Sequence, residues 1–307
     1  MTIMPSWSEV LTEIQLTQNH IHIAQNKSPL DIVRRKYLKA LFTKENRNVI
    51  AYYSGWLQKP NNDKAFINDD DKNGFMAAIH KMDRSKGLDL ILHTPGGQLA
   101  VTESLVDYLR KMFGNNIRAF IPQLAMSAGT MIACSCKEIY MGKQSSLGPV
   151  DPQFNGIAAY SVKAEFQKAI QGIKDDPASL PIWQAIIGRY HPTFIIECDN
   201  VINLASNMMR EWLKTGMFAG ESNSDTAINH IINKLNNHDD TKTHSRHIPI
   251  NELLDMGLKI IPLEQDQDLQ DIVLTIHHAY MHTLAQSASV KIIENHLENA
   301  VITFAKI

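Results

Sequence analysis

The sequence predicts an α/β protein with a largely parallel β-sheet and helical additions at both termini. Between positions 75 and 141, short apolar runs alternate with stretches of helical periodicity. The apolar runs are continuous, which is typical of parallel strands because both faces of such a sheet are buried. Small residues, mainly glycine and serine, separate strands from helices. This alternation indicates a sheet covered by helices.

The predicted elements follow in order along the chain. The first part comprises helices within 8–42, a strand at 48–53, a polar loop at 57–73, a helix at 75–83, strands at 88–92, 117–121 and 138–141, and a helix at 99–113. The second part comprises helices at 160–174, 180–189, 196–214 and 225–236, a polar loop at 237–247, a strand at 258–262 and a helical tail from about 268 to 298. We expect an N-terminal helical extension (1–45), a catalytic core (46–262) and a C-terminal helical tail (263–307).

Charge and composition exclude several classes of protein. The chain has 30 basic and 32 acidic side chains, so it lacks the electrostatic footprint of a nucleic-acid-binding protein. It has no run of 18 apolar residues and does not start with a basic, then apolar, leader. Its three cysteines have no framework spacing, which predicts reduced thiols. We therefore expect a soluble cytoplasmic protein without a membrane anchor.

Two clusters of polar residues are candidates for a metal site, and neither fits one well. The acidic run Asp69-Asp70-Asp71 predicts a solvated loop. His244 and His247 lie near His238 and Asp239, but without the ligand spacing of a zinc site they predict a histidine-rich loop at a substrate cleft. No P-loop is present. We expect neither a metal nor a cofactor.

The chain has a distinctive glycine turn between a buried strand and a helix, Pro95-Gly96-Gly97. Glycine permits a close backbone path that leaves amide N–H groups free to face a ligand. Taken alone, the turn is equally well explained by the geometry of the loop.

A second turn of small residues, Ser127-Ala128-Gly129, follows the next strand and opens a helix. A hydroxyl at such a strand-to-helix turn is similar to a nucleophile elbow, although the G-x-S-x-G pattern is absent. The competing interpretation is that Ser127 caps the helix, a role that serine fills well.

Three segments carry a family resemblance: HTPGG (93–97), AMSAGTMIA (125–133) and MGKQSSLGPVDPQ (141–153). Together they resemble the SppA-like serine dehydrogenase proteinase family, within the ClpP/crotonase superfamily. The segments RNVIAYYSGW (47–56) and KIIEN (291–295) extend the resemblance over nearly the whole chain. The resemblance implies a ClpP/crotonase-like core of ββα repeats, a serine peptidase acting on peptides or proteins, and a homo-oligomer.

The resemblance also implies roles for individual positions. Ser127 would be the nucleophile, and the amides of Gly97 and Ala128 would form the oxyanion hole. Gly96 and His93 would support the site, His93 by orienting the glycine turn. Further residues would line the cleft or fix turns, namely Ser145, Ser146, Asp151 and Gln153.

The general base is the least certain part of the predicted site. ClpP-type peptidases use a histidine downstream of the serine, but the window around Val150 to Gln153 contains none. SppA-like enzymes use a lysine farther along the chain, which implies Lys168, with Lys163 as the alternative. If neither lysine acts, the candidates are His93 and a histidine of the 238–247 loop. A lysine can act as base when burial lowers its pKa. The alternatives are a non-catalytic protein of this fold and an acyl-CoA-type crotonase-fold enzyme.

Overall fold

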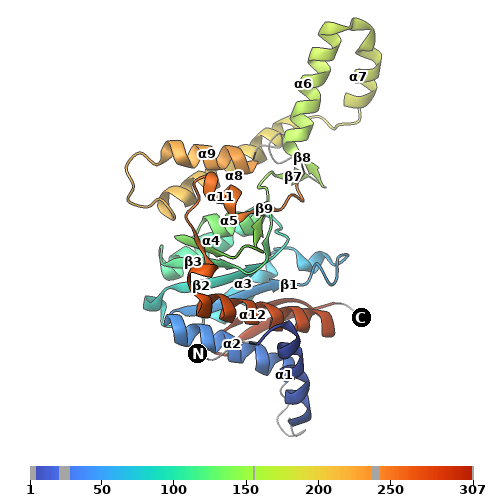
Figure 1. Ribbon diagram of the computed structural model, residues 1–307. Coiled ribbons are helices and arrows are strands. Elements are labelled where there is room, and N and C mark those ends of the chain that lie inside the picture. Colours follow the sequence, from blue (N-terminus) through green and yellow to red (C-terminus); the bar gives the residue numbers. More distant parts are fainter. Residues whose placement is uncertain (1–4, 21–27, 155, 237–242, 306–307) are drawn as a thin grey trace.

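A computed structural model of the protein describes residues 5–20, 28–154, 156–236 and 243–305. Its centre is a seven-stranded sheet (Figure 1). The strands lie in the order β10 (Ile260–Pro262), β5 (Glu138–Met141), β3 (Ile117–Ile121), β2 (Leu88–His93), β1 (Asn48–Ser54), β11 (Ser289–Asn295) and β12 (Ala300–Phe304). Strands β10, β5, β3, β2 and β1 run parallel to one another. Strand β11 pairs antiparallel with β1 on one side and with β12 on the other. The predicted mixed α/β fold with a largely parallel sheet is confirmed.

Helices cover both faces of the sheet and form a separate hydrophobic core on each. One face packs against α3 (Asp70–Ile79), α4 (Leu99–Phe113), α5 (Ala128–Cys134), α8 (Phe194–Thr215), α9 (Asp225–Asn236) and α11 (Ile250–Asp255). The other face packs against α1 (Trp7–His20), α2 (Pro29–Glu45) and α12 (Gln267–Gln286). Successive side chains of β1 alternate between the two cores, because side chains of a strand point to opposite faces.

Smaller elements surround the carboxyl ends of the parallel strands. A three-stranded sheet joins β4 (Leu124–Ala125), β6 (Ser146–Leu147) and β9 (Ile248–Pro249). A two-stranded ribbon, β7 (Gln153–Phe154) with β8 (Ile157–Ala158), leads into a hairpin of α6 (Ala159–Asp175) and α7 (Leu180–Ile187), which projects from the body (Figure 1). Short 3₁₀ helices are η2 (Asp63–Ala65), η3 (Arg84–Lys86), η4 (Pro177–Ser179) and η5 (Leu263–Gln265). No helix in the described ranges is long and apolar enough to cross a membrane.

Two predicted elements differ from the structure. The tail is not helical to 298, since α12 ends at Gln286 and the chain then returns as β11 beside β1. A short apolar run cannot be assigned to helix or strand by periodicity alone, and here the open edge of β1 selects the strand. The helix predicted at 75–83 begins at Asp70, so the acidic run is not a solvated loop, and Asp71 is 2% exposed. The predicted division at 45 and 262 stays a prediction.

A buried ionic network ties the two ends of the chain together. Arg34 of α2 donates to Glu294 of β11 over 2.9 Å, and both side chains are fully buried. Arg34 also donates to Thr283 over 3.0 Å and to Asp31 over 2.6 Å. Glu294 in turn accepts from Tyr280 over 2.9 Å. These contacts anchor α2 and α12 to the strand that borders β1.

We expect Arg34→Met to lower the free energy of unfolding by about 3 kcal/mol, because it leaves a buried carboxylate without one of its cationic partners. Equilibrium unfolding in urea measures this change. The exposed pair Lys111–Asp107 provides the control, since Lys111→Met should change stability by less than about 1 kcal/mol. Equal losses in the two variants would contradict the expected difference.

Candidate active site

The two turns singled out in the sequence lie against each other. Thr94, which follows β2, donates its N–H to Leu124 over 3.1 Å, and Met126 donates to the Thr94 carbonyl over 2.9 Å. Gly96 has φ +95°, and a Cβ there would lie 2.8 Å from both the Met126 carbonyl and the Ser127 Cβ. Only glycine fits this approach, so the close contact of the turns explains Gly96.

Ser127 has a strained backbone. Its φ is 51° and its ψ is −116°, a region that side chains with a Cβ rarely adopt. Such a conformation typically costs about 1–3 kcal/mol and is concentrated at functional sites. The side chain forms no capping hydrogen bond with α5, so the capping interpretation does not account for the serine. The geometry instead has the sharp strand-to-helix turn of a nucleophile elbow.

Gly97 runs beside an isolated strand-like segment around Ile67. Ile67 donates to the Gly96 carbonyl over 2.8 Å and accepts from the Gln98 amide over 3.1 Å. In this parallel pairing the Gly97 amide points away from Ile67, because successive backbone groups alternate in direction. A Cβ on Gly97 would lie 2.3 Å from the Ile67 carbonyl oxygen. The close approach of two backbones therefore requires glycine here.

The amides of Gly97 and Ala128 are both available to a ligand. No hydrogen bond within the described ranges uses either N–H as a donor. Both residues line one pocket of about 590 Å³ together with Ser127. Paired amides beside a hydroxyl have the layout needed to stabilise a developing oxyanion.

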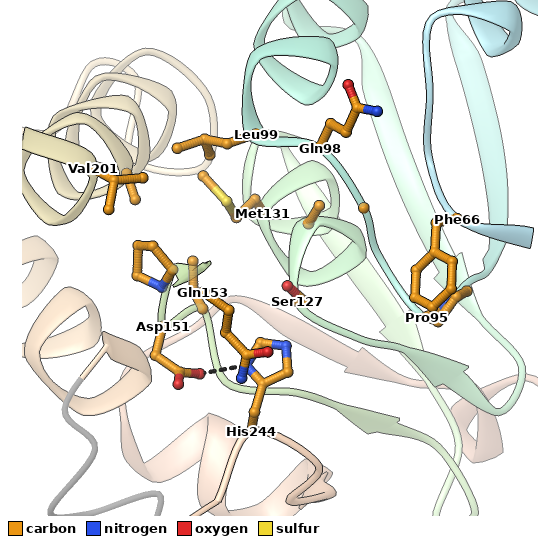
Figure 2. Close-up of a pocket in the computed structure, with 15 residues that line it drawn as sticks. Phe66, Pro95, Gln98, Leu99, Ser127, Met131, Asp151, Gln153, Val201 and His244 are labelled. Atoms are coloured by element: carbon orange, nitrogen blue, oxygen red, sulfur yellow. Dashed lines mark hydrogen bonds and ion pairs between the residues drawn. The ribbon is translucent and has the colours of Figure 1, made fainter. Parts of the chain in front are cut away.

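The same pocket contains a histidine–carboxylate pair. His244 Nδ1 lies 2.6 Å from Asp151 Oδ1, and the Asp151 side chain is fully buried. Figure 2 shows the His244 ring between Asp151 and Ser127. No hydrogen bond joins Ser127 Oγ to another described residue, and such contacts are often long in a free enzyme. A carboxylate bonded to Nδ1 fixes the orientation of an imidazole ring and leaves the opposite nitrogen free to contact another group.

The sequence analysis treated Asp151 as a turn residue and a histidine of the 238–247 loop only as a fallback base, and it did not predict that His244 and Asp151 form a pair. The two residues are 93 positions apart. The available signals were the DPQ element and a histidine-rich loop, and neither says that the two segments meet. His247 is exposed, and His238 and Asp239 lie outside the described residues.

The structure does not bring the predicted lysines to the pocket. Lys168 is exposed on α6, and Lys163 lies 2.5 Å from Asp199 of α8. The buried residues of α6 are Ala159, Val162 and Ala169, and Lys168 is exposed to solvent. The family resemblance and the distance from Ser127 along the chain suggested these lysines, and neither lines the pocket in the structure.

Two further predicted residues, His93 and Ser146, lie outside the pocket. His93 is fully buried against Tyr53, Trp56 and His277, and burial holds its pKa well below the usual range. It does not line the pocket, and neither does Ser146, which lies in β6. Within the described part of the chain, no group of His, Cys, Asp and Glu side chains could hold a metal ion. Cys134, Cys136 and Cys198 are buried free thiols.

Comparison with known proteins gives one family and two relatives. The model of a family described as ClpP-like SDH-type serine proteinase matches residues 24–299. The uncharacterized protein MJ0137 of Methanocaldococcus jannaschii is 35% identical over 152 residues, which are 48% of this chain and 52% of that protein. The uncharacterized protein MJ1495 of the same organism is 33% identical over 111 residues, 36% of this chain and 38% of that protein. The chain thus spans about half the length, or less, of these relatives.

The strained backbone of Ser127 predicts that this residue lowers the stability of the folded protein. Ser127→Gly should raise the free energy of unfolding by about 1 kcal/mol, because glycine adopts this backbone conformation without strain. Ser127→Ala should leave it within about 0.5 kcal/mol of the wild type. Ser146→Gly is the control, since Ser146 lies in ordinary strand backbone and should lose stability. Urea unfolding measures all three, and a Ser127→Gly variant less stable than Ser127→Ala would contradict the strain argument.

Proposed function

Because the chain belongs to the ClpP-like SDH-type serine proteinase family, we propose that it is a serine endopeptidase acting through an acyl-enzyme at Ser127. The observation that carries this proposal is a single pocket lined by a strained serine, two amides without acceptors, and a histidine–aspartate pair. The predicted family is confirmed by the match to residues 24–299. The catalytic roles below are part of the proposal.

In the proposed mechanism, Ser127 Oγ attacks the scissile carbonyl carbon while His244 Nε2 takes the hydroxyl proton. The carbonyl π electrons move to the oxygen, and the amides of Gly97 and Ala128 stabilise the resulting oxyanion. Collapse of the tetrahedral intermediate breaks the C–N bond, and His244 passes its proton to the leaving amine. Water then repeats the sequence on the acyl-enzyme, which releases the acid and restores Ser127.

We propose His244 as the base in preference to the lysine that the family resemblance implied. The bond between His244 and the buried Asp151 supports this choice, because a carboxylate stabilises the imidazolium that forms on proton transfer. Lys168 is exposed on α6 and is not among the residues that line the pocket, so its amine is not placed to take the proton of Ser127. Lys163 has an anionic partner instead, Asp199.

The lining of the pocket supports a peptide substrate with an apolar side chain next to the scissile bond. Apolar side chains lie on the α4, α5 and α8 side of Ser127, namely Leu99, Met131 and Val201 (Figure 2). No Lys or Arg is among the described residues that line the pocket, so a site for the phosphates of coenzyme A lacks its usual cations. This favours the peptidase over an acyl-CoA enzyme of the same fold.

A serine-reactive fluorophosphonate probe and a fluorogenic peptide test the assignments. Ser127→Ala should abolish labelling, and Asp151→Asn should slow acylation by about 10³- to 10⁴-fold, because the ring loses its orientation and its counter-charge. His244→Gln should be comparably impaired. Lys168→Met and Lys163→Met are matched controls that should stay within about twofold of the wild-type rate. An inactive Lys168→Met together with an active His244→Gln would return the base to the lysine.

We also propose a homo-oligomer that covers the α6–α7 hairpin. None of the residues of α7 is buried, although several of them are large and apolar. The side chain of Ile182 is 63% exposed and that of Leu180 is 41% exposed. Exposed apolar side chains clustered on one element mark interaction sites. Ile182→Asp should therefore reduce the molecular mass measured by light scattering, whereas Gln184→Asp on the same helix should not. A wild-type protein that is monomeric at micromolar concentration would refute the proposal.

A further inference from the structure

A buried ion pair lies behind the strand-like segment that contacts Gly97. Lys291 of β11 and Asp71 of α3 are each 2% exposed, and Lys291 Nζ lies 2.7 Å from Asp71 Oδ1. Neither residue lines the pocket, and the mechanism proposed above uses neither. The pair therefore requires a separate explanation.

The hydrogen bonds of this pair end on the backbone of the segment on both sides of Ile67. Lys291 Nζ donates to the Phe66 carbonyl over 2.7 Å. Asp71 Oδ2 accepts from the Asn68 amide over 3.2 Å and from the Tyr52 hydroxyl over 2.8 Å. Phe66 and Asn68 are thus fixed by opposite members of one ion pair, and Ile67 lies between them.

Ile67 in turn fixes the loop that presents the oxyanion amide. It is bonded to Gly96 on one side of Gly97 and to Gln98 on the other. The spacing between the two backbones is too small for a Cβ on Gly97, so a shift of Ile67 would shift Gly97 with it. A displacement of about 1 Å at a catalytic group can lower a rate by about 10²-fold.

We propose that Lys291 and Asp71 are positioning residues, which set the Gly97 amide for oxyanion stabilisation through the backbone of Phe66, Ile67 and Asn68. This inference rests on the proposed peptidase function. A buried ion pair is poor evidence for a purely stabilising role, because apolar side chains of similar size are often as stable. Burial lowers the pKa of Lys291 and raises that of Asp71, and their mutual attraction opposes both shifts. What an apolar pair could not supply is the set of bonds to the Phe66 and Asn68 backbone.

The test separates positioning from stability. Lys291→Met alone leaves a buried carboxylate uncompensated, so it is combined with Asp71→Asn, which removes that charge but keeps acceptors for Tyr52 and Asn68. The double variant should fold, yet its acylation by the fluorophosphonate probe should be at least tenfold slower than in the wild type. For a fluorogenic peptide, kcat should fall at least tenfold while KM stays within about threefold, since the amide acts on the transition state. Tyr52→Phe, which removes one bond to Asp71, should give a smaller loss.

Arg34→Met is the matched control, because it breaks the other buried ion pair of β11, which lies on the opposite face of that strand from Lys291 and, among the described residues, has no bond to the Ile67 segment. It should lose stability but acylate within about twofold of the wild-type rate per folded molecule. Hydrogen exchange provides a second readout: the Ile67 and Gln98 amides should exchange at least tenfold faster in the double variant, relative to amides inside β3, and not in Arg34→Met.

The outcomes decide between the claims. A double variant with wild-type acylation, or with unchanged exchange at Ile67 and Gln98, overturns the positioning role while leaving the peptidase proposal intact. An equal loss of acylation in Arg34→Met also overturns it, since the effect would then follow stability alone. If the wild type itself does not react with the probe, the peptidase proposal and the catalytic part of this inference fail together. The exchange measurement then decides by itself whether the pair holds the segment.

Discussion

The site depends on the close approach of three backbone segments, with a glycine at each contact. The Ile67 segment touches Gly97, and Gly96 touches the turn at Ser127. Each contact leaves less room than a Cβ needs, so both glycines are required by space, and Gly96 is also required by its positive φ. Because the segments are joined by backbone hydrogen bonds, the positions of the two amides and of the serine are set together rather than one by one.

The sheet supplies the rigidity that this arrangement needs. β1 lies between β2, which leads into the glycine turn, and β11, which carries both Lys291 and Glu294. One face of β11 sends Lys291 toward the segment behind Gly97, and the other sends Glu294 to Arg34 and Tyr280. Strand β11 therefore links the second hydrophobic core to the segment that contacts Gly97. This explains why buried charges occur in a strand whose other side chains are largely apolar.

The histidine–aspartate pair is built differently from the turns. In the small sheet of β4, β6 and β9, Asp151 follows β6 along the chain and His244 precedes β9. Antiparallel pairing of β6 with β9 brings the two flanking segments to the same side of the pocket. The proposed base is thus positioned by the pairing of two short strands, whereas Gly97 follows β2 of the main sheet and Ser127 follows β4 of the small sheet.

The sequence by itself determined the parallel α/β core, the two turns and the family, because each rests on local signals: continuous apolar strands, glycines where backbones approach, and a serine between small residues. It also selected Ser127, Gly97 and Ala128 as candidate site residues, through the family resemblance of contiguous motifs. Only the tertiary structure joined Asp151 to His244, placed Asp71 and Lys291 together, and directed Lys168 into solvent. Those outcomes depend on pairings between residues far apart in the chain, and on the direction of a projecting helix. Periodicity and spacing contain no information about either.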